Sequence, residues 1–227
     1  LGLIKVFQEE VFREFLQGDS LASIYAHCAG AAQKWVRLVA ERGAGLADDY
    51  LFELLSELKV LSKSVEDYGA QKGIALTAAK RLIELQGDQF LRGKGINCRF
   101  VISRLPEGAP LNERAVPISI FYFPEKARAR HLARWLGLPD ARSETLKSII
   151  DWDYYLERLT HAAQKIIILP AIAQGLPNPV PQLPVPAWLL AAPVKGRQAG
   201  LGEFFVKQPK TLADIEELAD RSAPPRA

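Results

Sequence analysis

Six prolines within 17 residues near the C-terminal end set the strongest limit on how this chain can fold. They are Pro177, Pro179, Pro181, Pro184, Pro186 and Pro193. Proline lacks a backbone N–H and has a fixed φ, so it interrupts helices and cannot donate to the ladder of a central strand. We therefore expect an extended connector on the surface here, followed by a linker and a flexible tail.

Apolar residues recur at helical spacing along the first third of the chain and again before the prolines. The spacing predicts helices over residues 3–16, 21–41, 50–58, 77–91, 125–136 and 153–169. Short polar side chains predict N-caps at Asp19 or Ser20, at Asp48 or Asp49, and at Thr77. The pair Gly43 and Gly45 would end the second helix. Gly137 would end the fifth helix, and Pro170 would stop the last.

In the middle of the chain the apolar pattern changes to one typical of strands. Residues 97–104 and 115–123 are rich in Val, Ile and aromatic side chains. The segment between them contains Pro106, Gly108 and Pro110, which predict a long hairpin loop. The expected fold is α+β: mainly helical, with a small antiparallel sheet, followed by the proline-rich connector and the tail.

Positive charge is concentrated in one short window, although the whole chain has a net charge of only +3. Residues 1–67 hold 7 Lys and Arg against 11 Asp and Glu, whereas residues 68–104 hold 7 against 2. Residues 105–227 hold 15 against 13. Such a cluster attracts polyanions even on a nearly neutral protein. Taken alone, a charged window is more often a solvated face than a binding site.

The chain begins with Leu1 and contains no Met, so we expect it to be a segment of a longer protein. The apolar run over residues 166–173 is interrupted by Pro170 and is shorter than the ~18 residues of a membrane span, so no membrane contact is expected. Cys28 and Cys98 match no metal-ligand spacing and are expected to be reduced thiols.

Nine segments, in order along nearly the full length of the chain, carry a resemblance to a known family. They are residues 5–12 (KVFQEEVF), 66–72 (EDYGAQK), 77–82 (TAAKRL), 87–89 (GDQ), 102–108 (ISRLPEG), 113–117 (ERAVP), 151–155 (DWDYY), 164–166 (QKI) and 178–181 (NPVP). Chance could supply any one of them, whereas the ordered set is specific. The set resembles the thumb of a B-family DNA polymerase, most of all that of the catalytic subunit of DNA polymerase epsilon.

The resemblance implies three parts: a palm-to-thumb connecting helix over residues 1–18, a thumb domain over residues 19–188, and a linker and tail over residues 189–227. A thumb grips duplex DNA behind the active site and does no chemistry itself. The implied partners are primer–template duplex DNA, the palm and other parts of the polymerase, and accessory replisome subunits. The implied setting is DNA replication in the nucleus, where the grip would support processive template-directed synthesis.

The resemblance also implies which residues contact DNA. They are Tyr68, Lys72, Thr77, Lys80, Arg81, Arg104 and Arg114. A thumb must follow the DNA backbone without reading its sequence, and cations, hydroxyls and helix N-termini contact phosphates in this way. For each single residue, the alternative is a surface charge or an ion pair with Glu84, Asp88, Glu107 or Glu113.

No catalytic or metal-binding residue is expected in this segment, and no cofactor. B-family polymerases carry their metal-binding carboxylates in a Tyr-Gly-Asp-Thr-Asp type of motif, which is absent here. We interpret Asp151 and Asp153 instead as the N-cap and acidic first turn of a helix. Mg²⁺ would belong to the active site of the parent DNA-directed DNA polymerase, a nucleotidyltransferase. His27, His131 and His161 have no acid or nucleophile at a suggestive spacing.

The tail contains a second candidate site. Gln198, Leu201, Phe204 and Phe205 fit the pattern Gln-x-x-Leu-x-x-Phe-Phe of peptides that dock on sliding clamps. One 3₁₀-like turn would place the leucine and both rings on one side, as a hydrophobic plug. The position of this motif just after the thumb agrees with the resemblance. The alternative is that the two rings pack back onto the thumb.

Two other functions remain as alternatives. The first is a protein-interaction module of the replisome that does not contact DNA, which the acidic first third would suit. The second is a free-standing hydrolase, for which no nucleophile–base pattern is present. Salt dependence separates DNA gripping from protein docking, because binding through phosphates weakens steeply with salt and apolar docking does not.

Overall fold

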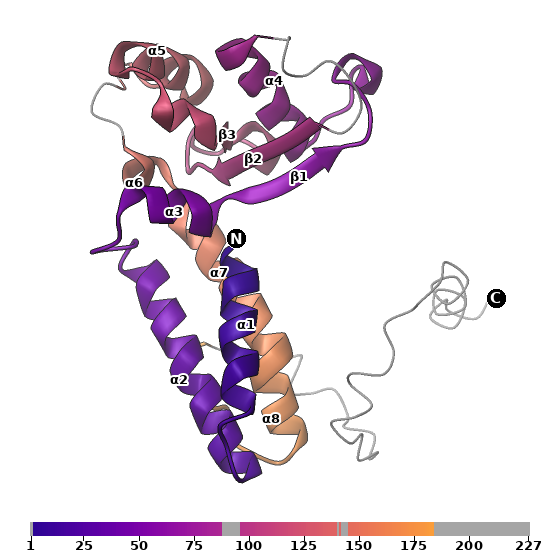
Figure 1. Ribbon diagram of the computed structural model, residues 1–227, viewed down its shortest axis with the longest axis vertical. Helices are drawn as coiled ribbons and strands as arrows, with labels where there is room; N and C mark the ends of the chain where they lie inside the picture. The colour runs from indigo at the N-terminus through magenta and orange to yellow at the C-terminus, as the bar shows by residue number, and fades with distance from the viewer. Residues whose placement is uncertain (1, 88–95, 140, 142–144, 184–227) are drawn as a thin grey trace, which may run out of the picture. The chain divides into compact units, whose positions relative to one another are not determined.

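The computed structural model describes residues 2–87, 96–139, 141 and 145–183. The chain divides into two units, residues 1–185 and 186–227, and the described residues all belong to the first. Within it, a layer of long helices meets a small sheet that carries further helices (Figure 1). In the described ranges every helix is too short or too polar to cross a membrane.

The helical layer consists of three packed helices. They are α1 (Leu3–Phe15), α2 (Leu21–Ala40) and α7 (Trp152–Ala163). Residues spaced by four along α1, Leu3, Phe7 and Val11, are buried on one face, as an amphipathic helix requires. The carboxylate of Glu10 in α1 accepts hydrogen bonds from Lys34 and from the indole N–H of Trp35 in α2, both at 2.8 Å. These bonds join α1 to α2 at the edge of the buried face.

The sheet has three antiparallel strands in the order β1–β2–β3. They are β1 (Glu57–Leu61), β2 (Ile96–Ile102) and β3 (Ala115–Pro117). Helix α4 (Ile74–Gln86) packs against all three strands. Short 3₁₀ turns cover Glu66–Tyr68, Leu111–Glu113 and Ile118–Tyr122. The predicted hairpin between the second and third strands is confirmed, with Val101 opposite Val116.

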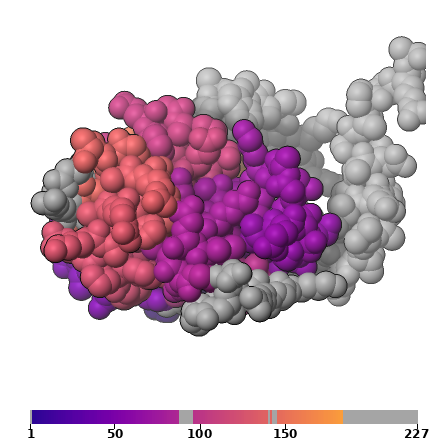
Figure 2. Space-filling model, turned by 90° about the horizontal axis from the view of Figure 1, so that it is seen from above, coloured from indigo at the N-terminus to yellow at the C-terminus, as the bar shows by residue number. Residues whose placement is uncertain are grey.

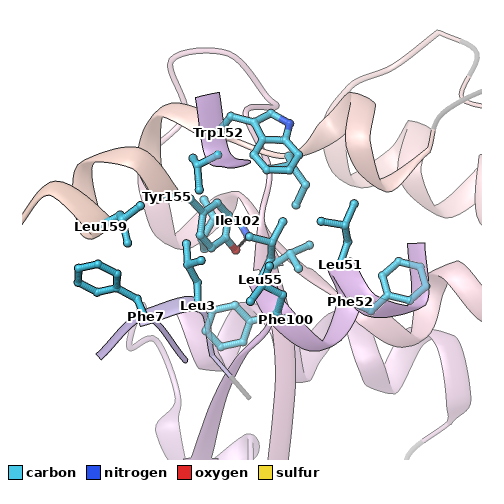
Figure 3. Close-up of a cluster of buried hydrophobic side chains, with 14 of the residues drawn as sticks. Leu3, Phe7, Leu51, Phe52, Leu55, Phe100, Ile102, Trp152, Tyr155 and Leu159 are labelled. Atoms are coloured by element: carbon cyan, nitrogen blue, oxygen red, sulfur yellow. Dashed lines mark hydrogen bonds between the residues drawn. The ribbon is translucent and has the colours of Figure 1, made fainter. Parts of the chain in front are cut away.

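Buried side chains from distant parts of the chain meet where the sheet contacts the helical layer (Figure 3). Phe7 of α1, Phe100 of β2 and Leu159 of α7 are each at most 1% exposed. The hydroxyl of Tyr155 in α7 accepts a hydrogen bond from the backbone N–H of Ile102 at 3.1 Å. Burial of each large apolar side chain contributes about 1.5–3 kcal/mol, so this contact holds the sheet against the helices.

The remaining helices frame this core. They are α3 (Asp48–Leu55), α5 (Glu125–Leu136), α6 (Leu146–Ile149), the π-helical turn Gln164–Ile168 and α8 (Leu169–Ala173). The predicted helix over residues 125–136 is confirmed, and Gly137 ends it in the left-handed conformation. Ser20 is confirmed as the N-cap of α2, where its hydroxyl accepts from the N–H of Ser23 at 3.2 Å. The α+β fold class is confirmed.

Two predicted boundaries around the first strand were wrong. The helix expected over residues 50–58 ends at Leu55, and β1 begins at Glu57 because its backbone pairs with β2, far along the chain. Neither Asp48 nor Asp49 is the N-cap: Ala47 holds that place, and both carboxylates lie in the first turn. There they act on the helix dipole instead.

The start predicted for α4 was also wrong. The helix begins at Ile74, one turn before Thr77, and the N–H of Thr77 already donates to the carbonyl of Gly73 at 3.0 Å. Thr77 therefore lies inside the helix and caps nothing. The predicted end at residue 91 was wrong as well, because Gly87 terminates the helix with φ of 82°.

The third strand and the last helix differ from prediction for local reasons. The strand expected over residues 115–123 ends at Pro117, which has no N–H for the ladder, and a 3₁₀ turn follows. Pro170 does not stop the last helical segment. A π-helical turn precedes it, and Pro170 lies in the first turn of α8, where a missing N–H costs little.

Candidate nucleic-acid interface

Four of the predicted DNA-contact residues lie just before α4 or in its first two turns: Tyr68, Lys72, Thr77 and Lys80. Gly73 is the N-cap residue of α4, and its lack of a side chain leaves the first N–H groups of the helix without a side-chain cap. Lys72 and Lys80 are exposed, and neither forms an ion pair with a described residue. Lys72 lies just before the open N-terminus of α4, where the helix dipole adds to its positive charge, and Lys80 adds a second exposed cation in the next turn.

Tyr68 orients the loop that leads into this surface. Its hydroxyl contacts both the backbone N–H and the hydroxyl of Ser62, each at 3.2 Å. These hydrogen bonds lower the pKa of Tyr68. The phenol therefore ties the end of β1 to the 3₁₀ turn before α4, and it remains half-exposed at the surface.

Arg81 lies in a different environment from its neighbour Lys80. Its guanidinium donates to the backbone carbonyls of Ala115 at 2.6 Å, Glu113 at 2.9 Å and Trp135 at 3.2 Å. It also lies over the Trp135 ring, 5.4 Å from the centroid. Burial lowers the pKa of Arg81 to about 10, which leaves it charged near neutral pH. This geometry indicates that Arg81 joins α4 to β3 and α5.

The two arginines of the hairpin lie at either side of its mouth. The N–H of Ser103 donates to the carbonyl of Arg114 at 2.8 Å, so Arg104 and Arg114 flank the last paired residues. Arg104 is exposed, and its Nε donates to the carbonyl of Ser148 at 3.1 Å. Arg114 is mostly buried and pairs with the carboxylate of Asp151 at 2.5 Å. Of the two, Arg104 is the one with an exposed side chain.

Asp151 confirms the predicted N-cap. One carboxylate oxygen accepts from the N–H of Tyr154 at 3.0 Å, and the other pairs with Arg114. Asp153 is exposed in the first turn of α7. Both carboxylate oxygens of Asp151 are thus bound by groups within the protein. Asp151 and Asp153 therefore do not fit a Mg²⁺ site. Over the described ranges, no group of three or more potential ligands is placed to hold a metal ion.

The two thiols and the buried His131 show no catalytic arrangement with other described residues. Burial raises the pKa of Cys28 to about 12 and that of Cys98 to about 11, so both stay protonated and unreactive. Burial lowers the pKa of His131, and the positive charges of Arg130 and Arg134 lower it further. His131 packs against Trp135 with ring centroids 5.3 Å apart.

Sequence reasoning missed a second group of cations, on α5. Lys126, Arg130 and Arg134 recur at intervals of four and are all exposed. The spacing was visible in the sequence, but the helix lies outside the most basic window. The clamp-type residues Gln198, Leu201, Phe204 and Phe205 lie outside the described residues.

Comparison with known proteins identifies the class and then the family. Residues 1–174 match the family model for the thumb domain of the DNA polymerase epsilon catalytic subunit. The chain is therefore a thumb domain of a DNA polymerase catalytic subunit. It belongs to the DNA polymerase epsilon catalytic subunit family.

Curated relatives agree with this assignment. The chain is 44% identical to the DNA polymerase epsilon catalytic subunit of Emericella nidulans over 95% of this chain and 10% of that protein. It is 44% identical to the Schizosaccharomyces pombe protein, over 83% and 9%. It is 39% identical to a DNA polymerase epsilon catalytic subunit of Arabidopsis thaliana, over 99% and 11%. The chain thus spans about a tenth of the length of these relatives.

Among solved structures, the chain is similar to the family B DNA polymerase of the hyperthermophilic archaeon Pyrobaculum calidifontis. The TM-score is 0.47 at 22% sequence identity, over 72% of this chain and 17% of that one.

Proposed function

We propose that this thumb grips duplex primer–template DNA through its phosphates and so supports processive, template-directed synthesis by a nuclear replicative polymerase. The observation that carries the proposal is the pair of exposed cations Lys72 and Lys80. Lys72 lies just before the open N-terminus of α4 and Lys80 lies in its second turn, and neither has an ion-pair partner among the described residues. Thr77 and Tyr68 add hydroxyl groups, and exposed Arg104 lies at the hairpin mouth. Such contacts hold a duplex without reading its sequence.

Two of the arginines expected to contact DNA, Arg81 and Arg114, have a structural role in this proposal. Arg81 and Arg114 are engaged by carbonyl oxygens and by a carboxylate within the domain. We therefore assign the phosphate contacts to Lys72, Lys80 and Arg104, and assign Arg81 and Arg114 to holding the surface in place. The chemistry of nucleotide addition, with its Mg²⁺ ions, belongs in this proposal to the palm of the polymerase.

A salt series tests the proposal. Fluorescence anisotropy of a labelled primer–template duplex should show binding that is independent of base sequence, prefers duplex to single strand, and weakens as salt rises. The variant K72Q/K80Q should reduce the slope of log K against log salt by about 1.8, at about 0.9 for each lost phosphate contact. Binding that ignores salt would reject the proposal and favour protein docking.

A protein-contact role has support from the outer face of β1. Leu58 is 58% exposed and Val60 is 59% exposed, and alternate residues of a strand share one face. We propose that the palm or other parts of the polymerase, or accessory replisome subunits, cover this face. This role adds to DNA gripping, because Leu58 and Val60 are distinct from the residues proposed to contact DNA.

The tail supplies a second proposed partner. Gln198, Leu201, Phe204 and Phe205 fit the spacing of a clamp-docking peptide. Two aromatic rings buried in one pocket would supply most of the affinity. We propose that this motif tethers the polymerase to a sliding clamp while the thumb holds the duplex.

A further inference from the structure

We infer that the cations of α5 form a second phosphate-binding ridge, which continues the α4 surface along the same duplex. The ridge consists of Lys126, Arg130 and Arg134. This inference rests on the proposed function, and it names a contact surface outside the basic window of the sequence. Residues four apart share one helix face and lie about 6 Å apart along the axis, so the three charges form a row.

The row faces away from the core of the domain. The buried side of α5 consists of Ala129, His131, Leu132, Trp135 and Leu136. Viewed from above, the residues of α5 and those of α4 lie on the same face of the molecule (Figure 2). Lys80 lies one helical turn before Glu84 of α4, which approaches Arg134 of α5 at 4.0 Å, so a ligand that covers Lys80 can extend over α5.

Helices α4 and α5 are held together by side chains other than those proposed to contact DNA. The indole N–H of Trp135 in α5 donates to Glu84 of α4 at 2.7 Å, and Arg81 of α4 binds the Trp135 carbonyl. These contacts come from both helices and set their relative orientation. The spacing between the α4 cations and the row on α5 is thus part of the fold.

The charge of the row is largely uncompensated within the described part of the chain. Lys126 and Arg130 pair with no acidic group there, and Arg134 approaches Glu84 only at 4.0 Å with its side chain 62% exposed. Glu125 is the acidic residue of this helix. The positive charges of Arg130 and Arg134 also help to lower the pKa of His131. The surface therefore attracts a ligand with closely spaced negative charges.

The surroundings of the row favour a nucleic-acid backbone over an acidic protein. Lys126 and Arg130 border a hollow together with one acidic residue, Glu125, and its remaining described walls are short side chains: Ala129, Ala133, Pro139 and Ala141. Protein interfaces draw most of their affinity from large aromatic or aliphatic anchors, and the described walls of this hollow present none. A sugar–phosphate backbone needs only room and repeated cations. We therefore assign the row to the duplex that α4 holds.

The test compares two variants of the full chain that lose the same charge. K126Q/R130Q/R134Q removes the row, whereas R13Q/R37Q/K165Q removes three exposed cations from α1, α2 and the π-helical turn. Duplex affinity is measured by fluorescence anisotropy across a salt series, and folding of each variant is checked by its thermal melt. We expect the first variant to lower the salt slope by about 2–3, at about 0.9 per contact, and the second to leave it nearly unchanged.

The other possible outcomes of this comparison are interpreted as follows. Equal slopes for the unchanged chain and K126Q/R130Q/R134Q overturn the inference, and the proposed function stands if K72Q/K80Q still lowers the slope. Equal losses in both triple variants also overturn it, because only net charge would then matter. If the row variant loses binding to a poly-glutamate peptide but keeps duplex binding, the row serves an acidic protein instead. An unchanged chain that binds no duplex at low salt rejects the proposed function, and the inference with it.

Discussion

Arg81 and Trp135 hold two helices of this thumb together through both main chain and side chain. The guanidinium of Arg81 donates to the Trp135 carbonyl at 3.2 Å and lies 5.4 Å from the centre of its indole ring. The carbonyl belongs to the last turn of α5, where unpaired carbonyls and the helix dipole favour a cation. A residue in the basic window thus stabilises the surface on which its neighbours are displayed.

Replacement of Arg81 by Ala should lower the stability of the domain. Hydrogen bonds from a charged group contribute about 1.5–3 kcal/mol, and the partly buried carbonyls would lose their partner. We expect the free energy of unfolding in urea to fall by about 2–4 kcal/mol. The control K80A, at an exposed position, should stay within about 0.5 kcal/mol of the unchanged chain.

The salt slope decides whether Arg81 also touches phosphate. Measured at a temperature where the variant is folded, R81A should keep the slope of the unchanged chain, while K80A should lower it by about 0.9. If the salt slope of R81A also fell by about 0.9, Arg81 would be a phosphate contact.

Replacement of Asp151 by Ala should weaken the junction between the hairpin and α7. The change removes an N-cap, which is worth about 1 kcal/mol, and leaves the mostly buried Arg114 without its ion-pair partner. We expect a loss of about 2–4 kcal/mol in chemical unfolding. The matched control D153A removes a carboxylate from the exposed first turn and should cost less than about 1 kcal/mol. Similar losses for both would contradict the cap and ion-pair roles.

His131 should make the folded domain sensitive to mild acid. Its pKa in the folded state is lowered from 6.5, first by burial and then by Arg130 and Arg134, so the unfolded chain takes up this proton more readily. The contribution to stability is fully present above pH 6.5 and is lost as the pH falls from there toward the folded-state pKa. Urea unfolding at a series of pH values measures it. In H131F this part of the pH dependence should disappear, and parallel curves for the two proteins would contradict the assignment.

Replacement of both Phe204 and Phe205 by Ala should abolish binding to a sliding clamp and leave duplex binding unchanged. The two rings supply the apolar area of the proposed plug, whereas the DNA contacts lie in the folded domain. Surface-immobilised clamp and the anisotropy assay measure the two activities separately. The control Q208A lies just beyond the motif and should bind the clamp normally. Clamp binding retained by F204A/F205A would show that the motif has no role.

Local sequence signals were enough to predict several secondary-structure elements of this protein. The helix over residues 125–136 ends at Gly137, and α7 begins at its Asp151 cap, because caps act on backbone groups within a few residues. The amphipathic faces of α1 and α2 follow from periodicity alone. The sequence by itself therefore determined the fold class, the hairpin, most helices and the family.

Tertiary structure decided what depends on partners far along the chain. Strand β1 exists because Glu57–Leu61 pairs with Ile96–Phe100, a long-range contact that local spacing does not encode. Lys80 and Arg81 are adjacent cations with the same sequence signal, yet one is exposed to solvent and the other is bound by carbonyls of residues 113, 115 and 135. Only the packing of α4 between β3 and α5 separates their roles, because it determines which side chain meets water and which meets backbone oxygen.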